Sequence, residues 1–161
     1  MRRSRTLIAA LAALALASCA VVVQSYVPPA DGDTASLAVV NGTQGSVQVF
    51  VYREATTCKG RNSLPFIEPG NSAATVIHAG GPVAMSATAS LSTMGPACRY
   101  MFSFDAARSK KYILRIRQEG NTCYFRLGDA TAAGSEPEVP TRERTGGRGL
   151  DENSSFCDPV N

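Results

Sequence analysis

The stretch 98-CRYMFSFDAARSKKYILRIRQEGNTCYFRL-127 decides the fold of this chain. Apolar and polar side chains alternate through three runs of it, and a period of two places successive side chains on opposite faces of a β-strand. The polar segments 105–110 and 119–121 separate the runs and offer turn residues. We therefore expect three strands, each with one apolar face. The apolar positions are Tyr100, Phe102, Phe104, Tyr112, Leu114, Ile116, Cys123, Phe125 and Leu127.

One register places all nine apolar side chains on the same face of a three-stranded sheet. In this register the strand 111–118 lies between the other two, and Glu119-Gly120 forms a two-residue hairpin loop. The opposite face is then cationic, with Arg99 directly across from Arg117. Like charges so placed destabilise a sheet unless an anion neutralises them, so this face is the candidate binding site. Its members are Arg99, Arg115, Arg117, Tyr124 and Arg126.

Short runs rich in β-branched and aromatic residues also precede this stretch, and turn dipeptides such as Asn41-Gly42 and Gly80-Gly81 separate them. The predicted strands are 36–40, 46–53, 63–67, 73–78, 82–91, 98–104, 111–118 and 122–127. No window has apolar residues at helical spacing over three turns, so we expect little helix. The sequence predicts a mainly β domain over 36–127, an antiparallel β-sandwich of about seven or eight short strands. A small β-barrel is the alternative.

The N-terminus reads as a targeting segment. Three arginines within residues 2–5 precede the apolar run 7–16, which suits a signal peptide and is too short to span a bilayer. The run ends in Leu16-Ala17-Ser18-Cys19, which closely resembles the lipobox of bacterial lipoproteins. An ordinary signal peptide or an uncleaved anchor is the alternative.

The lipobox resemblance implies a diacylglycerol group on Cys19 and cleavage just before it. Residues 1–18 would then be the signal peptide, and 19–35 a polar spacer between the lipid and the domain. In such lipoproteins an aspartate after the cysteine favours the inner membrane, whereas here Ala20 follows. The resemblance therefore implies the periplasmic face of the outer membrane. The domain also resembles the small transthyretin-like and immunoglobulin-like sandwiches of envelope lipoproteins, at the level of fold alone.

The composition narrows the class of protein. The 161 residues are 44% hydrophobic and 18% charged, which is ordinary for one globular domain and excludes a multi-span membrane protein, a coiled coil or a fully disordered chain. The net charge of +3 comes from Arg2, Arg3 and Arg5, because the other 13 basic residues balance the 13 acidic ones. We therefore expect no nucleic-acid partner.

Four cysteines remain once Cys19 is set aside, and in an oxidising compartment they predict two disulfides. We expect the pairs Cys58–Cys98 and Cys123–Cys157, with Cys58–Cys123 and Cys98–Cys157 as the alternative. The register argues against Cys98–Cys123. Two strand spacings would separate their Cα atoms by roughly 9–10 Å, beyond the reach of a disulfide.

Residues 128–161 lose the strand pattern and read as an extended, loosely packed tail that Cys157 pins to the domain. Residues 53–126 carry a net charge of +6, whereas 136–158 carry −3. Two sources can supply the anion for the arginine surface: an anionic envelope ligand, or the tail itself. The candidate tail acids are Glu138, Glu143, Asp151 and Glu152.

No pattern points to catalysis. His78 is the single histidine, and no nucleophile motif or phosphate-binding glycine loop accompanies it. The cysteine spacing does not suit a metal site either, so we expect no catalytic residues, metal or cofactor. The function this leaves is a non-enzymatic binding or adaptor module of the cell envelope, anchored through Cys19, with an envelope protein or anionic polymer as partner. The alternatives are a periplasmic inhibitor of a hydrolase such as lysozyme and a secretion-system accessory lipoprotein.

Overall fold

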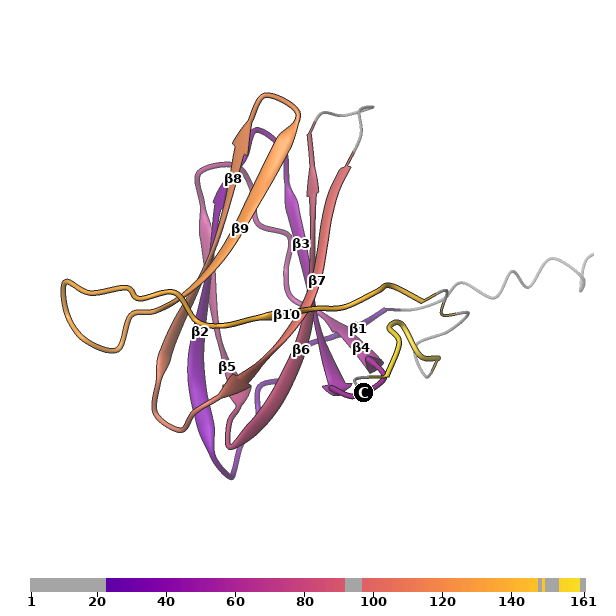
Figure 1. Ribbon diagram of the computed structural model, residues 1–161, viewed down its shortest axis with the longest axis vertical. Coiled ribbons are helices and arrows are strands. Elements are labelled where there is room, and N and C mark those ends of the chain that lie inside the picture. The colour runs from indigo at the N-terminus through magenta and orange to yellow at the C-terminus, as the bar shows by residue number, and fades with distance from the viewer. Residues whose placement is uncertain (1–22, 92–96, 148, 150–153, 160–161) are drawn as a thin grey trace, which may run out of the picture.

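A computed structural model describes residues 23–91, 97–147, 149 and 154–159, and these form two β-sheets packed face to face (Figure 1). The predicted β-sandwich is confirmed, and the two sheets do not close into a barrel. The described residues contain no helix, and hence none that is long and apolar enough to cross a membrane. The strands are β1 Gln24–Ser25, β2 Thr34–Gly42, β3 Val47–Glu54, β4 Lys59–Ser63, β5 Ser72–His78, β6 Gly81–Ser90, β7 Ala97–Ala106, β8 Lys111–Glu119, β9 Thr122–Asp129 and β10 Arg142–Glu143.

The six-stranded sheet has the order β1-β4-β3-β6-β7-β10, and the four-stranded sheet has the order β5-β2-β8-β9. Two pairings are parallel, β1 with β4 and β2 with β8, and the other pairings between described strands are antiparallel. The chain enters the four-stranded sheet three times, with β2, with β5 and with β8–β9. The parallel pair β2–β8 arises because β8 enters after a crossing from β7 and runs in the same direction as β2. Both sheets are therefore mixed.

The core lies between the two sheets and is built from the inward positions of every long strand. Phe102, Leu114 and Ile116 are fully buried, and Phe104 is nearly so. Tyr100 stacks on both Phe102 and Phe125, at ring-centroid distances of 4.9 and 5.2 Å. The inward direction expected for these residues is thus confirmed: Phe102, Phe104, Leu114 and Ile116 belong to the core, and Tyr100 and Phe125 are partly buried against it.

The expected register of the three decisive strands is wrong in two ways. First, β7 pairs with β6 and not with β8, so it belongs to the other sheet. Second, β8 and β9 are paired two residues away from the expected alignment: Glu119 faces Thr122 and the loop is Gly120-Asn121. Gly120 has a φ of +59°, which suits glycine at the first position of this tight loop. Both errors preserve the faces, because a shift of two residues, or a change of sheet, leaves inward residues inward.

The two disulfides also differ from the expected pairs. Cys98 is bonded to Cys123, with Cα atoms 6.0 Å apart, and Cys58 to Cys157, with Cα atoms 5.4 Å apart. The pair that the register excluded therefore forms, because Cys98 and Cys123 do not flank β8 within one sheet. They lie on β7 and β9 of opposite sheets, β7 having no outer neighbour near Cys98 because β10 pairs only with Phe102 and Ser103, and the bond closes that side of the sandwich.

Three strands had no prediction. β4 has the sequence Lys-Gly-Arg-Asn-Ser, which contains no apolar residue, so the hydrophobic pattern does not reveal it. The expected strand 63–67 shares only Ser63 with β4, although Leu64 and Ile67 make backbone bonds to β3. The short strands β1 and β10 lie in the expected spacer and tail; β1 pairs with β4, and β10 pairs with β7.

The tail runs along one side of the sandwich, and Figure 1 shows it in orange and yellow as it passes from β9 toward β10. The Val139 N–H donates to the Leu127 carbonyl of β9 (2.8 Å). Further on, β10 pairs with β7, and the Arg144 N–H donates to the Met101 carbonyl (2.8 Å). The tail therefore covers one edge of each sheet, at β9 and at β7.

The end of the tail builds a second, smaller core on the outer face of the six-stranded sheet. Phe156 is 5% exposed and packs on Tyr52, with ring centroids 6.0 Å apart. Arg144 is buried as well, and its guanidinium donates to the carbonyls of Ala55, Thr56 and Asp158. Cys157 pins the tail to the domain as expected, through its disulfide to Cys58, whereas the loose packing expected for the tail is wrong at Arg144, which is buried. The apolar members of this core are Tyr52, Cys58, Ala84, Met101, Phe156 and Cys157.

Candidate anion-binding face

Four of the five predicted site residues lie together on the outer face of the four-stranded sheet. Arg115 and Arg117 come from β8, and Tyr124 and Arg126 from β9. The register places Arg115 opposite Arg126 and Arg117 opposite Tyr124. These positions alternate with the buried core residues of the same strands, so the side chains point away from the core. We call these four residues the arginine face.

Arg99 does not belong to the arginine face, and its predicted position opposite Arg117 is wrong. It lies on β7 in the six-stranded sheet, where its cross-strand partner is Thr88 of β6. Burial raises the pKa of the Tyr52 hydroxyl, and the nearby Arg99 opposes that rise. Arg99 therefore faces outward on the opposite side of the molecule, and the like-charge pair that singled out this face does not form.

Glu136 neutralises two members of the arginine face. Its carboxylate accepts from Arg115 through Nε (2.8 Å) and Nη2 (2.6 Å), and from Arg126 through Nη1 (3.3 Å). Arg126 also donates to the Glu136 main-chain carbonyl. The Arg115 guanidinium holds the pKa of the Glu136 carboxyl below its usual range. Such two-point contacts between a guanidinium and a carboxylate are among the stronger hydrogen bonds in proteins.

The chain reaches this position because Gly128 lacks a side chain. A Cβ at Gly128 would lie 2.5 Å from Cγ of Glu136, so any larger residue would push the glutamate away. Among the expected tail acids, Glu138 lies at the rim, 4.0 Å from Arg126. Glu143 lies in β10 on the other sheet, and Asp151 and Glu152 fall outside the described residues. Sequence reasoning missed Glu136 itself, because no periodic pattern marks a loop residue that contacts a strand 21 positions away.

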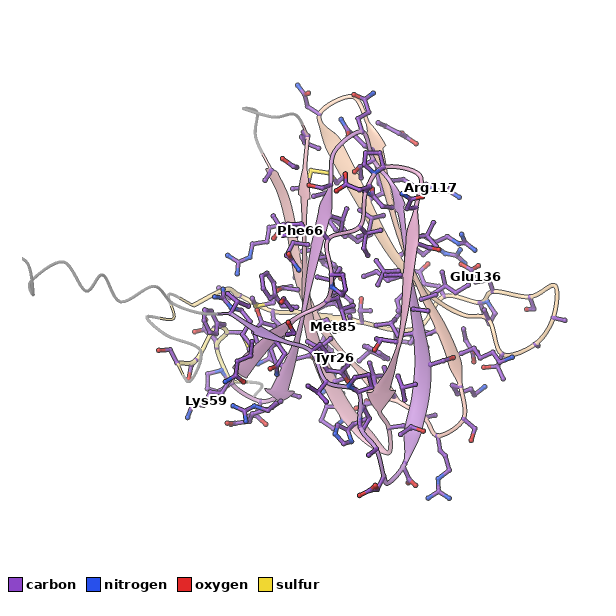
Figure 2. All side chains as sticks on the ribbon, turned by 180° about the vertical axis from the view of Figure 1, so that it is seen from behind. Tyr26, Lys59, Phe66, Met85, Arg117 and Glu136 are labelled. Carbon is purple, nitrogen blue, oxygen red and sulfur yellow. A yellow bond between two sulfur atoms is a disulfide. The ribbon has the colours of Figure 1, made fainter. Side chains whose placement is uncertain are left out.

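Arg117 has a different environment from its two neighbours. No carboxylate of the described residues lies within ion-pair distance of it. It borders a shallow depression of about 170 Å³ together with Glu119 and the other three members of the arginine face. Tyr124, which is 51% exposed, presents its ring there. Figure 2 labels Arg117 nearer the β8–β9 hairpin and Glu136 beside the projecting loop.

This arrangement can bind an anion without reacting with it. A guanidinium recognises carboxylate or phosphate oxygens by paired hydrogen bonds, and an exposed aromatic ring can pack against the flat side of a bound group. His78 lies exposed at the end of β5, away from the arginine face. In the part of the chain that the structure describes, no three metal-ligating side chains are grouped. No protein-family model matches this sequence, and no curated protein matches it either.

Proposed function

We propose that this chain is a lipid-anchored binding module of the bacterial cell envelope that holds an anionic envelope ligand on its arginine face. The anchor is acylated Cys19, and the domain would stand at the periplasmic face of the outer membrane. A non-enzymatic adaptor of this kind needs a stable scaffold, an exposed recognition surface and a tether. The sandwich with its two disulfides and the outward-facing arginines support the first two, and the lipobox supports the third.

The carboxylate of Glu136 seated between Arg115 and Arg126 is the observation that carries this proposal. It supplies an internal example of the ligand chemistry, because a carboxylate already makes paired hydrogen bonds to this surface. Arg117 and Tyr124 extend the same surface, and Arg117 forms no ion pair with Glu136. An external carboxylate or phosphate would bind beside Glu136 at Arg117, or replace Glu136 at Arg115.

Binding of the full chain to lipopolysaccharide and to isolated peptidoglycan tests the proposal, since these polymers supply phosphates and carboxylates respectively. We expect Arg117→Gln to weaken binding to one of them at least tenfold. Arg99→Gln is the matched control, because it removes the same charge from the opposite outer face. Equal binding by wild type and Arg117→Gln, or equal losses in both variants, would contradict a site at the arginine face.

Glu136→Gln sharpens the same experiment. Removal of the carboxylate frees Arg115 and Arg126, so we expect tighter binding of the same ligand, by about tenfold. Deleting the tail is the poorer test, because the tail carries Phe156 and the Cys58–Cys157 disulfide. A surface that serves only for self-neutralisation would bind neither polymer in wild type.

The anchor is tested by membrane fractionation with intact mass analysis. We expect wild type to be membrane-bound, with a mature mass that begins at acylated Cys19. Cys19→Ala should leave the precursor uncleaved or release the protein from the membrane. Equal membrane binding and processing at the same position in this variant would contradict lipidation.

The loop between β9 and β10 favours a second candidate, an inhibitor of an incoming hydrolase such as lysozyme. Figure 1 shows this loop projecting from the body of the sandwich. Its residues 131–135 are small and exposed, so they could enter an active-site cleft. Inhibition of lysozyme by the full chain, lost in the variant Ala133→Arg, would favour this function over a binding role for the arginine face.

A further inference from the structure

The strand β5 is the long edge strand that lacks a neighbour on its outer side. β4 borders β1, β7 borders β10, and β9 is bonded to residues 137–139 of the tail. β5 pairs only with β2, within the part of the chain that the structure describes. A free edge of this kind offers a row of backbone donors and acceptors to another strand.

The register identifies the free backbone groups. The bonds from the Ala79 N–H to Asp33 and from the Asn41 N–H to Asn71 fix the alternation of bonded pairs between the two strands. Ala73, Thr75 and Ile77 therefore exchange hydrogen bonds with β2. The N–H and C=O groups of the four even-numbered residues of β5 point to the open edge. These residues are Ser72, Ala74, Val76 and His78.

This edge lacks the usual protection against pairing. Residues 72–77 are Ser-Ala-Ala-Thr-Val-Ile, without a charge or a proline, whereas exposed edges commonly carry lysine or proline. Val76 is 36% exposed. Val27, in the N-terminal strap formed by residues 24–27, is 80% exposed, and Phe66, in the loop between β4 and β5, is 68% exposed. Three of the four large hydrophobic residues that are exposed in the described structure thus belong to β5 and to the segments that flank it (Tyr26 and Phe66 are labelled in Figure 2).

A cavity of about 310 Å³ opens at the end of this edge. His78 of β5 lines it, together with Arg53 of β3 and residues 24–27 of the N-terminal strap. Val51 and Val83 give it an apolar floor, and none of its lining residues is acidic. The volume falls at the lower end of the range for small-ligand sites. A cavity with an apolar floor, one guanidinium and one imidazole suits an apolar side chain beside a carboxylate.

We propose that this side of the molecule receives the C-terminal segment of a partner protein, which adds to β5 as an extra strand and places its last, apolar residue in the cavity. The free edge supplies the main-chain hydrogen bonds, and Arg53 with His78 supplies the complement to the terminal carboxylate. Arg53 is available for this role, because it forms no ion pair with a carboxylate of the described residues. This surface lies on β3 and β5, apart from the arginine face, so the inference is independent of the proposed function.

In the absence of a partner strand, Tyr26 occupies one of the hydrogen-bonding positions on the open edge of β5. Its hydroxyl donates to the Val76 carbonyl (3.0 Å), which is one of the free acceptors of the edge. A partner's N–H would take that position, and Tyr26 also lines the cavity that the partner's last side chain would enter. Tyr26 must therefore move when the peptide binds, and its hydrogen bond competes with the peptide.

The test is selection of the full chain, in detergent, against a library of random hexapeptides with free C-terminal carboxylates. We expect enrichment of peptides with an apolar last residue. The same peptides with amidated C-termini should bind at least fivefold more weakly, and this comparison needs no protein variant. Absence of enrichment, or equal binding of acids and amides, would overturn the proposal.

Three variants locate the peptide. Val76→Pro removes an outward N–H without touching the bonds to β2 and should weaken binding at least tenfold, whereas Val76→Thr, the matched control, should bind as wild type does. Tyr26→Phe frees the Val76 carbonyl and should tighten binding a few-fold, which a purely structural tyrosine would not do. Equal binding by Val76→Pro, folded as judged by its melting curve, would overturn strand addition. So would dimerisation through this edge without peptide binding, because a second copy would then be the occupant.

Discussion

Successive parts of the same tail pack on the two outer faces of the sandwich. Ion pairs hold the tail on one face, and apolar packing with a disulfide holds it on the other. On the four-stranded sheet the loop before β10 covers β8 and β9 through Glu136, with ion pairs whose members are one-fifth to nearly one-half exposed. On the six-stranded sheet the end of the tail is held by buried Phe156, buried Arg144 and the disulfide to Cys58. We call the Glu136 contacts the ionic cover, whose members are partly exposed to solvent. We call the packing of Phe156 and the Cys58–Cys157 disulfide the covalent cover, which is apolar.

The difference indicates which cover can be exchanged for a ligand. Ion pairs at a surface contribute little to stability, weaken with salt and can be replaced by another anion. An apolar cover with a disulfide depends weakly on salt and cannot leave without exposing its core. This difference supports the proposal that the arginine face is a recognition surface, whereas the second core is part of the scaffold.

The largest effect should follow loss of the covalent cover. Cys58→Ala combined with Cys157→Ala should lower the free energy of unfolding by about 4–5 kcal/mol, because the bond closes a loop across 99 positions. Urea unfolding of the oxidised proteins measures this. Cys98→Ala with Cys123→Ala is the matched control and should cost about 3–4 kcal/mol, because that bond spans 25 positions. A smaller loss for the first pair than for the second would show that the tail does not depend on its disulfide.

The apolar part of the same cover should have the next largest effect. Phe156→Ala should cost about 3 kcal/mol, because it removes a ring that is 5% exposed and packs on Tyr52. The loss should be the same in low and high salt. Phe66→Ala is the control, since that ring is 68% exposed and its removal should change stability by less than about 0.5 kcal/mol. Equal melting curves for the two variants would contradict the second core.

The sequence could predict which side of a strand each side chain lies on, but not which strands are neighbours in a sheet. Alternation placed Leu114 inside and Arg115 outside, and both are confirmed, because side-chain direction depends only on parity along the strand. It could not show that the chain crosses between sheets after β7. The connection from Ala106 to Lys111 fits a hairpin as well as a crossing, and the rejection of Cys98–Cys123 followed from that choice.

Contacts between residues far apart in the chain were also beyond reach. Asn41 reads as a turn residue, but its side chain is fully buried and donates to the carbonyls of Gly45 (2.8 Å) and Ile67 (2.7 Å). Glu136 and the buried Arg144 likewise occur in stretches that lack any hydrophobic period. Such polar contacts satisfy groups that the fold has already brought together, so they follow from the tertiary structure and leave no local signal.

A smaller and salt-dependent effect should follow loss of the ionic cover. Glu136→Gln should cost about 1 kcal/mol at low salt, and less in 1 M salt, because its ion pairs are partly exposed. The folded pKa of Glu136 is lowered, so wild type should lose this contribution as the pH falls below the ordinary glutamate range, and the variant should not. Chemical unfolding from pH 7 to pH 3 measures both. A variant that keeps the full pH dependence of wild type would assign it to other groups.

Asp129, near the other end of the same loop, separates the two contributions. Hydrogen bonds from Lys110 and Thr131 lower the pKa of its carboxyl from 3.8 to about 2. A lowered folded pKa stabilises the fold above the unfolded value and ceases to do so as the pH falls through the folded one. Asp129→Asn should therefore remove the dependence between about pH 4 and pH 2, and leave the part that Glu136 contributes at higher pH.

The smallest effect on stability, and the sharpest on binding, should belong to Arg117. Arg117→Gln should change the free energy of unfolding by less than about 0.5 kcal/mol, since no carboxylate of the described residues pairs with it. Arg115→Gln, which breaks the paired hydrogen bonds to Glu136, should cost more. If instead Arg117→Gln destabilised the fold as much as Arg115→Gln, its role would be structural. Arg117 forms no ion pair with a carboxylate of the described residues, whereas Glu136 pairs with Arg115 and Arg126, so the guanidinium of Arg117 is available for recognition. We therefore expect Arg115→Gln to lower stability more than Arg117→Gln does, and Arg117→Gln to weaken ligand binding more than Arg115→Gln does.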